Sequence, residues 1–406
     1  MIKNVESTSA YCGIDISKDT FDYCIVDQNK QILCQGHLPI NINSLEQLKK
    51  IALENVKQNT IFLMESTAKY HRRVSLFLET AGFEVYVVQP LLIKKYNESK
   101  DLRKTKTDKK DAKMIAEYTV DNHNTLYLYK PEYDELKDLL RFYHSLVKDL
   151  TAYKNRYKEI MESVFPELLK VNDIYSKTLL RVLHEICVPG DIVKKRLSTL
   201  DNLLKNPKGK NISLTGKKLK EIAKSSIGIS HGSTSLIVRH LIDSINEIIL
   251  HIETIKKEVE KLTDERFKEN KQIVSSINGI GNIMAMSFLV ETKDINLFSS
   301  WKKISAYAGI DPCISQSGSS INRKGGISKR GNKYLRSTLF LMAQSVIKWC
   351  PRYKQYYKKK RDEGKSYKES IIAVANKLVK LLYSLLNKGM FYSEDYEKSN
   401  SLLQVI

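Results

Sequence analysis

The sequence predicts an α/β domain at the N-terminus, then long coiled-coil helices, then a mostly helical C-terminal domain. Three patterns indicate this order. Short strands with tight connections give way to alternating helices and strands, two heptad repeats of apolar residues follow, and the last part holds long helical stretches. These patterns place the domain boundaries at residues 8–125, 130–268 and 270–392.

The first domain opens with three short strands. Tyr11–Ile16, Phe21–Asp27 and Gln31–His37 are joined by tight connections, as in an antiparallel meander. Helices and strands then alternate, and this order is that of an RNase H-like sheet. The expected elements are a helix over Ser44–Glu54, a strand over Thr60–Glu65, a helix over His71–Ala81, a strand over Phe83–Val88 and a helix over Thr107–Val120.

Two heptad repeats predict long helices in the middle of the chain. The first runs from Leu136 to Val164, where Pro166 ends or bends the helix, and the second runs from Val238 to Leu262. The apolar spacing alternates between three and four residues, which is typical of a coiled-coil seam. An antiparallel pair, a dimerisation arm and ordinary bundle packing all explain it. Residues 166–233 look helical, and no chemistry is assigned to them.

The charge of the chain predicts a polyanionic partner. The 406 residues include 67 Lys and Arg against 46 Asp and Glu, a formal net charge of +21. Such an excess attracts nucleic acids, although basic enzymes of basic proteomes share it. No apolar run approaches the roughly 18 residues that span a bilayer, and the polar N-terminus does not resemble a secretion signal. We therefore expect a cytoplasmic protein without a membrane partner.

Four carboxylates occupy positions where an RNase H-like sheet brings them together. Asp15 lies inside an apolar strand, where a charge is costly unless it is paired or binds a metal, and Glu65 ends the strand that neighbours it. Asp108 and Asp111 share a face at the start of the helix that packs across these strand ends. Converging carboxylates need cations, and hard oxygen ligands select Mg²⁺ or Mn²⁺. Alone, Asp108 and Asp111 would be better explained as acids that complement the helix dipole.

Three further acids follow Asp15 closely in the sequence. Asp19, Asp22 and Asp27 are interpreted as turn or surface residues. Asp19 also suits a supporting position next to the metal site.

A stretch rich in Ser, Gly and basic residues lies in the C-terminal domain. Glycine lets the backbone approach a phosphate, and basic side chains neutralise it. The residues alone indicate a basic DNA-binding loop, in which a serine can in principle attack a scissile phosphate. The residues expected to contact nucleic acid here are Gly318, Arg323, Lys324, Lys329, Arg330, Lys333 and Arg336.

Two other C-terminal segments suit contact with nucleic acid. Gly279 and Gly281 form a turn between apolar helical stretches that is similar to a helix-hairpin-helix turn, whose N–H groups can hold a phosphate. A plain connection between helices explains the turn nearly as well. Arg352–Lys368 interleaves Tyr with Lys and Arg, which favours backbone contact and base stacking, or simply a solvated helix face. Helices are expected around Lys333–Trp349 and Ser370–Asn387.

The order of these motifs resembles the DEDD transposases of the insertion sequence 110 family, also called bridge-RNA-guided recombinases. The resemblance covers roughly residues 10–165 and 270–350. The motifs that carry it are Asp15 in GIDISKDTF, Glu65 in MESTAKYH, Asp108 and Asp111 in KTDKKDAKMIA, and the C-terminal run INGIG…AYAGIDP…QSG…GGISKRGNKYLR.

The resemblance implies a RuvC-like N-terminal domain, a coiled-coil arm and a C-terminal transposase domain. It implies that Asp15, Glu65, Asp108 and Asp111 hold Mg²⁺, or Mn²⁺, and that the serine of the Ser-Gly motif, Ser317, joins covalently to DNA. We expect one composite site that uses both sets of residues. The alternative is that the two domains act separately, one as a junction resolvase and the other as a strand-transfer site.

The resemblance also implies partners. Family members act as oligomers, here expected to be a dimer or tetramer through the coiled-coil arms. They use a non-coding bridge RNA encoded by the element to select double-stranded donor and target DNA, so the bound protein would associate with a bacterial or archaeal nucleoid.

Three alternatives stay open. A RuvC-like Holliday-junction nuclease that uses water would keep cleavage without Ser317. An actin-like or sugar-kinase-type ATPase is suggested because GIDISKDTFDYCIVD resembles the first phosphate loop of that superfamily, but the loop lacks the usual glycines. A non-catalytic nucleic-acid-binding protein would keep its function after Asp15→Ala.

Overall fold

The computed structural model describes residues 9–393, apart from 56–58, 67–68, 101–107, 124–125, 127, 206–212 and 318–320. Within these residues no helix is both long enough and apolar enough to cross a membrane. The chain divides into two compact units. One consists of Met1–Glu135 and Glu291–Met390, and the other consists of Leu136–Val290 with the residues after Met390.

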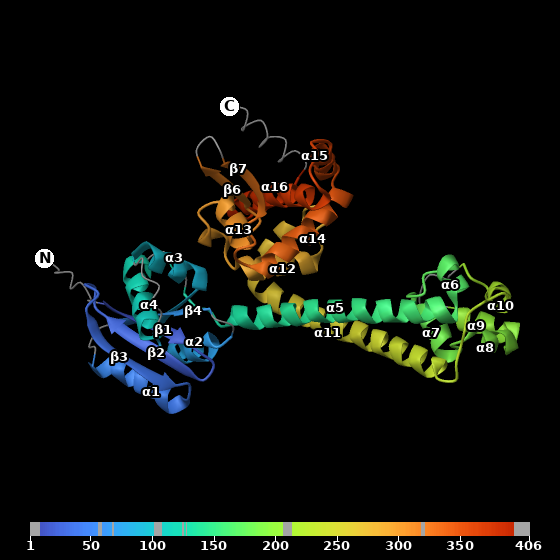
Figure 1. The fold of residues 1–406 in the computed structure, drawn as a ribbon, viewed down its shortest axis with the longest axis horizontal. Helices are drawn as coiled ribbons and strands as arrows, with labels where there is room; N and C mark the ends of the chain where they lie inside the picture. Colours follow the sequence, from blue (N-terminus) through green and yellow to red (C-terminus); the bar gives the residue numbers. More distant parts are fainter. Residues whose placement is uncertain are drawn as a thin grey trace. The chain divides into compact units, whose positions relative to one another are not determined.

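A mixed five-stranded sheet forms the centre of the N-terminal domain, with the strand order β3-β2-β1-β4-β5 (Figure 1). The strands β1 (Ser9–Ile16), β2 (Thr20–Val26) and β3 (Ile32–Pro39) form an antiparallel meander. The strands β4 (Asn59–Glu65) and β5 (Glu84–Val88) extend the sheet in parallel from β1. The α/β character of this domain and all five predicted strands are confirmed.

Helices cover both faces of the sheet because the strands are apolar on both sides. One face packs against α1 (Ile42–Lys50), which continues as a π-helical turn over Ile51–Asn55, and against α2 (His71–Thr80). The other face packs against α3 (Pro90–Lys100) and α4 (Asp108–Asn122). The sequence predicted α1, α2 and α4 but not α3.

Helix α4 lies unusually close to the sheet at Gly13 in β1. A Cβ atom added to Gly13 would overlap the backbone of Ala112 and Ala116 on α4. The missing side chain therefore lets helix backbone and strand backbone touch.

Replacing Gly13 with Ala is expected to destabilise the protein by about 1–3 kcal/mol or more, because neither backbone can yield without moving α4. Chemical denaturation followed by circular dichroism would measure the loss. The matched control is Gly190→Ala, since a Cβ atom added to Gly190 meets nothing. Equal stability of the two variants would contradict the close approach of α4.

The second unit contains two long helices that run side by side (Figure 1). The first heptad repeat lies in α5 (Glu132–Val164) and the second in α11 (Thr234–Ser275), so both predicted helices are confirmed. Helix α5 ends just before Pro166, as expected. Helix α11 is kinked at Phe267, where φ is −132° and ψ is 21°. We call this pair of helices the arm.

Among the described residues, five short helices connect α5 to α11 and form what we call the tip (Figure 1). A single apolar core holds them against the arm, with Phe165, Leu183, Leu219 and Ile242 among its buried members. The helices are α6 (Pro166–Val171), α7 (Lys177–Glu185), α8 (Pro189–Lys194), α9 (Leu197–Leu204) and α10 (Gly216–Lys224).

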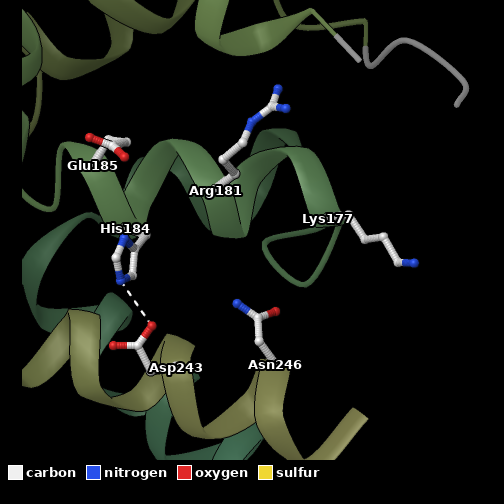
Figure 2. A pocket seen from close by; sticks show the side chains of 6 residues that line it. All are labelled: Lys177, Arg181, His184, Glu185, Asp243 and Asn246. Atoms are coloured by element: carbon white, nitrogen blue, oxygen red, sulfur yellow. Dashed lines mark ion pairs between the residues drawn. The ribbon is translucent and has the colours of Figure 1, made fainter. Parts of the chain in front are cut away.

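Polar contacts also fix α7 to its neighbours. Figure 2 shows His184 on α7 facing Asp243 on α11, with 2.9 Å between Nε2 and Oδ1. On the same helix, Arg181 donates from Nη2 to the carbonyl oxygens of Leu203 and Lys205 at the end of α9, at 2.7 Å and 2.6 Å. These contacts of Arg181 and His184 therefore help to hold the tip together.

The C-terminal part is mostly helical, as predicted. Helix α12 (Asn282–Thr292) is followed by a short 3₁₀ turn at Ile295–Leu297 and by α13 (Trp301–Ala308). Helices α14 (Lys333–Trp349), α15 (Pro351–Asp362) and α16 (Tyr367–Lys388) pack together, with one face of α16 deeply buried. The basic stretch that looked like a loop contains a hairpin of β6 (Pro312–Ser317) and β7 (Ile321–Ile327).

Candidate active site

Asp15 and Glu65 lie at the carboxyl ends of two adjacent parallel strands. The β1–β4 register pairs Ile14 with Met64, and Asp15 and Glu65 are the next residues of the two strands. Side chains alternate between the faces of a strand. Tyr11 of β1, with Ile61 and Leu63 of β4, packs in the core beneath α4. Asp15 and Glu65 therefore lie on the same face of the sheet as α4.

Helix α4 brings Asp111 to this end of the sheet. The helix begins at Asp108, so Asp111 lies in its first turn. Ala112, the next residue, touches β1 at Gly13, two positions before Asp15. The Asp108 side chain lies outside the described residues. Asp15, Glu65 and Asp111 are each half-buried, as expected of carboxylates at the rim of a domain.

The donor set is chemically suited to a hard divalent cation, because every member offers carboxylate oxygens. Within the part of the chain that the structure describes, no three His, Cys, Asp or Glu side chains form a ready-made metal cluster. The fold places Asp15, Glu65 and Asp111 at the same end of the sheet, but their side chains do not converge into such a cluster. The fourth predicted ligand, Asp108, would have to complete the set.

Asp22 is a buried acid beside this edge, which the sequence interpretation missed. The sequence predicts a turn or surface residue here, but Asp22 lies inside β2, 6% exposed and directly opposite Asp15. Its Oδ2 atom is 2.9 Å from Nδ1 of His37 on β3. The signal in the sequence was the alternation of Asp22 with Cys24 and Val26, which share its face of the strand. Asp27, by contrast, is a turn acid as predicted, because its Oδ1 accepts from Asn29 N and Gln31 N.

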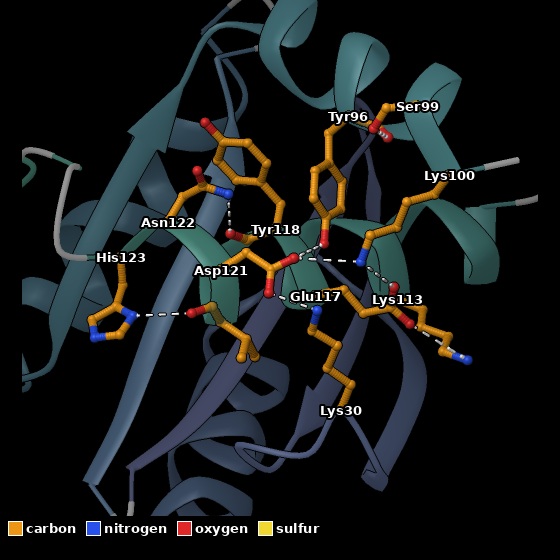
Figure 3. A network of polar contacts seen from close by, with 11 residues as sticks. Lys30, Tyr96, Ser99, Lys100, Lys113, Glu117, Tyr118, Asp121, Asn122 and His123 are labelled. Atoms are coloured by element: carbon orange, nitrogen blue, oxygen red, sulfur yellow. Dashed lines mark hydrogen bonds and ion pairs between the residues drawn. The ribbon is translucent and has the colours of Figure 1, made fainter.

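A polar network fixes the far end of α4 (Figure 3). Asp121 lies 2.6 Å from Nζ of Lys30 in the turn between β2 and β3, and accepts from the hydroxyl of Tyr96 on α3 at 2.5 Å. Lys100 approaches the same carboxylate at 3.4 Å. Burial alone would raise the pKa of the Asp121 carboxyl, but the hydrogen bonds from Lys30 and Tyr96 outweigh it and lower the pKa to about 2.

Asp121→Asn is expected to reduce stability at neutral pH and much less in acid. A carboxyl whose pKa falls from 3.8 to about 2 on folding stabilises the native state above about pH 4, and that contribution disappears as the pH falls towards 2. Denaturant unfolding of the variant and the parent at pH values from 7 to 2 measures the difference between their free energies of unfolding. Asp19→Asn, in the exposed turn after β1, removes the same charge without breaking the network. A difference in free energy of unfolding that stays constant with pH would contradict the lowered pKa of the Asp121 carboxyl.

Ser317 is the last residue of β6, and its backbone pairs with that of Ile321 on β7. Its side chain, Gly318, and the side chains of Arg323 and Lys324 lie outside the described residues. The predicted nucleophile and part of the basic set are therefore placed only by the backbone of the hairpin.

The segment after β7 is held by contacts that leave three cations exposed. Asn332 caps α14 by accepting from the N–H groups of Tyr334 and Leu335, and donates to Glu291 at 2.6 Å. Arg336, half-buried, donates from Nη1 to the carbonyl oxygen of Ala308 at 2.8 Å and so has a structural contact. The cations that remain exposed are Lys329, Arg330 and Lys333.

Gly279 and Gly281 lie in a tight connection between α11 and α12, as predicted. Gly279 has φ of +96°, which favours glycine. Ile277 and Ile280 are buried and anchor the turn. Gly281 is exposed just before α12 begins at Asn282.

The tyrosines of α15 are less available than the sequence suggested. Tyr353 is fully buried, and the Nζ atom of Lys377 lies 4.7 Å from the ring centre of Tyr356. Tyr357 packs edge-on against Tyr367. Base stacking by these rings is therefore disfavoured, whereas the lysines and arginines of α15 stay at the surface.

Two family models match the chain. The DEDD transposase model of IS110, described as "Transposase", matches residues 12–166, and the model "Transposase IS116/IS110/IS902 family" matches residues 271–358. The chain is therefore a transposase, an enzyme that acts on DNA. It belongs to the IS110 family.

Similar proteins extend over most of the chain. The "Pilin gene-inverting protein" of Moraxella bovis is 26% identical over 390 residues, which are 94% of this chain and 97% of that protein. The "Transposase for insertion sequence element IS1111A" of Coxiella burnetii is 23% identical and covers 94% of this chain and 90% of its own length. A Streptomyces coelicolor protein of insertion element IS110 is 23% identical over 71% of this chain and 72% of its own length.

Proposed function

We propose that this transposase cleaves and rejoins double-stranded DNA with Mg²⁺ or Mn²⁺ held by Asp15, Glu65, Asp108 and Asp111. The observation that carries the proposal is the placement of Asp15 and Glu65 at adjacent strand ends beneath the first turn of α4. The strand order and the position of α4 support an RNase H-like domain. When bound, the divalent ion supplies positive charge for the phosphate under attack.

Ser317 is assigned as the nucleophile that cleaves the first DNA strand. Its Oγ atom attacks the scissile phosphorus, an Oγ–P bond forms, and the P–O bond to the departing strand breaks. The serine proton leaves to solvent or a nearby base, and the departing strand oxygen takes up a proton. Attack by a strand hydroxyl on the phosphoserine reverses these bonds and rejoins DNA. Lys329, Arg330 and Lys333, all exposed beside the hairpin, are assigned to binding the DNA phosphates.

A bridge RNA is proposed as the source of sequence specificity. The net charge of +21 suits binding of more than one nucleic acid, and guidance by base pairing needs no base-reading residues in the protein. The test is to purify the protein from cells that carry its flanking DNA and to sequence the RNA bound to it. One abundant RNA from the flank is expected. No specific RNA, with Mg²⁺-dependent cleavage of branched DNA, would favour a junction nuclease.

The arm is proposed to join copies of the chain into a dimer or tetramer. Ile248, Ile252 and Ile255 continue the seam of α11 but are only half-buried, and the neighbouring Leu250 is 61% exposed. Apolar seam residues that one pair of helices leaves open are covered when another arm packs on them. Sedimentation of the full chain would give the number of copies.

A further inference from the structure

The tip has a folded core but no part in the function proposed above. Its helices α6 to α10 occupy residues 166–224, between the segments that the two family models match. Twenty-one buried residues of the tip and the adjoining arm form one core. A stable module of this kind presents a fixed surface, and its charge indicates what that surface binds.

Residues 194–205 and 213–224 of the tip are strongly basic. They contain eight Lys and Arg and only two acids, Asp201 and Glu221. Asp201 is already engaged, because its Oδ1 accepts from Gly216 N at 2.8 Å. Lys194 is paired with Asp191. Within the described part of the tip, the other seven cations of these segments have no carboxylate within ion-pair distance.

The fold gathers most of these cations from α10 and from the connection between α8 and α9. Helices α8 and α10 pack together, and Nζ of Lys220 on α10 donates to the carbonyl oxygen of Lys195 after α8, at 2.6 Å. On α10, Leu219 and Ala223 face the core, which turns the lysines outward. We call this surface the basic face. It consists of Lys195, Arg196, Lys217, Lys218, Lys220 and Lys224, all exposed except Lys220, which is half-buried.

Two lysines lie at the start of α10, in addition to the Asp201 carboxylate that accepts from Gly216 N. Lys217 and Lys218 lie in its first turn, which has no acidic residue. The helix dipole places partial positive charge there, so cations at this end repel it. A phosphate bound to the two lysine ammonium groups would reduce this repulsion, whereas the N–H groups of Gly216 and Lys218 already donate to Asp201 and Thr215. Side-chain charges that oppose the helix dipole in this way are typical of binding sites.

We propose that the basic face of the tip binds the phosphodiester backbone of nucleic acid. It gives the transposase a contact that is separate from the carboxylates and from Ser317. The proposal rests on the proposed function only in that the enzyme handles nucleic acid. DNA and RNA share this backbone chemistry, and the experiment below distinguishes them.

The test compares two charge-matched variants of the full chain. K217Q/K218Q/K224Q removes three charges from the basic face, and it spares Lys220 because its ammonium holds α8. K256Q/K257Q/K261Q removes three exposed charges from α11. Fluorescence anisotropy measures the affinity of each for a DNA duplex and for an RNA hairpin as salt is varied. Glutamine keeps the helix propensity of lysine, and circular dichroism checks the fold.

The tip variant is expected to bind more weakly and with a shallower dependence on salt. The slope of log K against log salt should fall by about 2 to 3 for duplex DNA, and by about 2 if the protein holds the single-stranded loop of the RNA hairpin. The α11 variant should match the parent. Loss with only one of the two probes identifies the nucleic acid. A second variant, K195Q/R196Q, lies outside α10 and should also weaken binding.

Two outcomes would overturn the proposal. Equal losses in the tip and α11 variants would mean that only total charge matters. Unchanged binding by both tip variants would leave the basic face to another partner, such as an acidic protein. The Asp15→Asn variant should bind both probes as the parent does, so a failure of the catalytic proposal is distinguishable from a failure of this one.

Discussion

Asp15→Asn is expected to lower the rate of first-strand cleavage by about 10³-fold in Mg²⁺, while DNA binding is retained. The substitution keeps the shape of the side chain but removes a negative charge from the edge shared with Glu65 and Asp111. A bound metal ion stabilises the charge of the transition state by several kcal/mol. Each ~1.4 kcal/mol of lost stabilisation lowers the rate tenfold. A labelled duplex that carries the element's end, incubated with protein and its guide, gives the rate directly.

The control for this prediction is Asp27→Asn. It removes a carboxylate from the same domain, and the asparagine oxygen can still accept from Asn29 N and Gln31 N. Its cleavage rate should equal that of the parent. A fully active Asp15→Asn protein would favour a site elsewhere in the chain or a protein that only binds nucleic acid.

Ser317→Ala is expected to abolish the covalent protein–DNA product and to slow strand cleavage by about 10⁴-fold or more, on the scale of losing the nucleophile in serine enzymes. Denaturing gels of labelled DNA show the adduct as a slowly migrating band. Ser315→Ala, two residues earlier in β6, is the matched control and should keep the adduct. The same experiment tests the neighbouring Ser319 and Ser320.

The serine variants also separate two mechanisms. Cleavage by Ser317→Ala without any adduct would mean that water is the nucleophile, as in a junction nuclease. An adduct that is lost only in Ser315→Ala, Ser319→Ala or Ser320→Ala would move the nucleophile to that residue and leave the serine mechanism intact.

Elements with a clear pattern of apolar residues were predictable from the sequence. Elements that depend on tertiary contacts were not. The five strands follow from short apolar runs with tight connections, and the two long helices follow from heptad spacing, because burial enforces both patterns. Helix α3 was missed because its apolar residues gather in its first turns and do not repeat along it. The β6–β7 hairpin was missed because Ser, Gly and basic residues favour a loop, whereas pairing of the two strands decides the structure.

The candidate site was predictable in part for the same reason. Asp15 and Glu65 are conspicuous because each interrupts or ends an apolar strand. Asp22 is hidden, since its importance depends on the β1–β2 register that sets it opposite Asp15 and on the β2–β3 register that sets it opposite His37. The tyrosines of α15 were overestimated as stacking residues, because nothing local shows that Lys377, on another helix, packs against Tyr356.

The contact between Gly13 and α4 also bears on how the site tolerates change. Where helix and strand are separated by side chains, a smaller or larger residue shifts the helix and carries its functional groups along. At Gly13 the spacing is set by main chain against main chain, so repacking elsewhere beneath α4, at Ile115 for example, has little freedom to alter it. The core under this helix can therefore drift in sequence over generations while the separation of Asp15 from Asp111 stays constant.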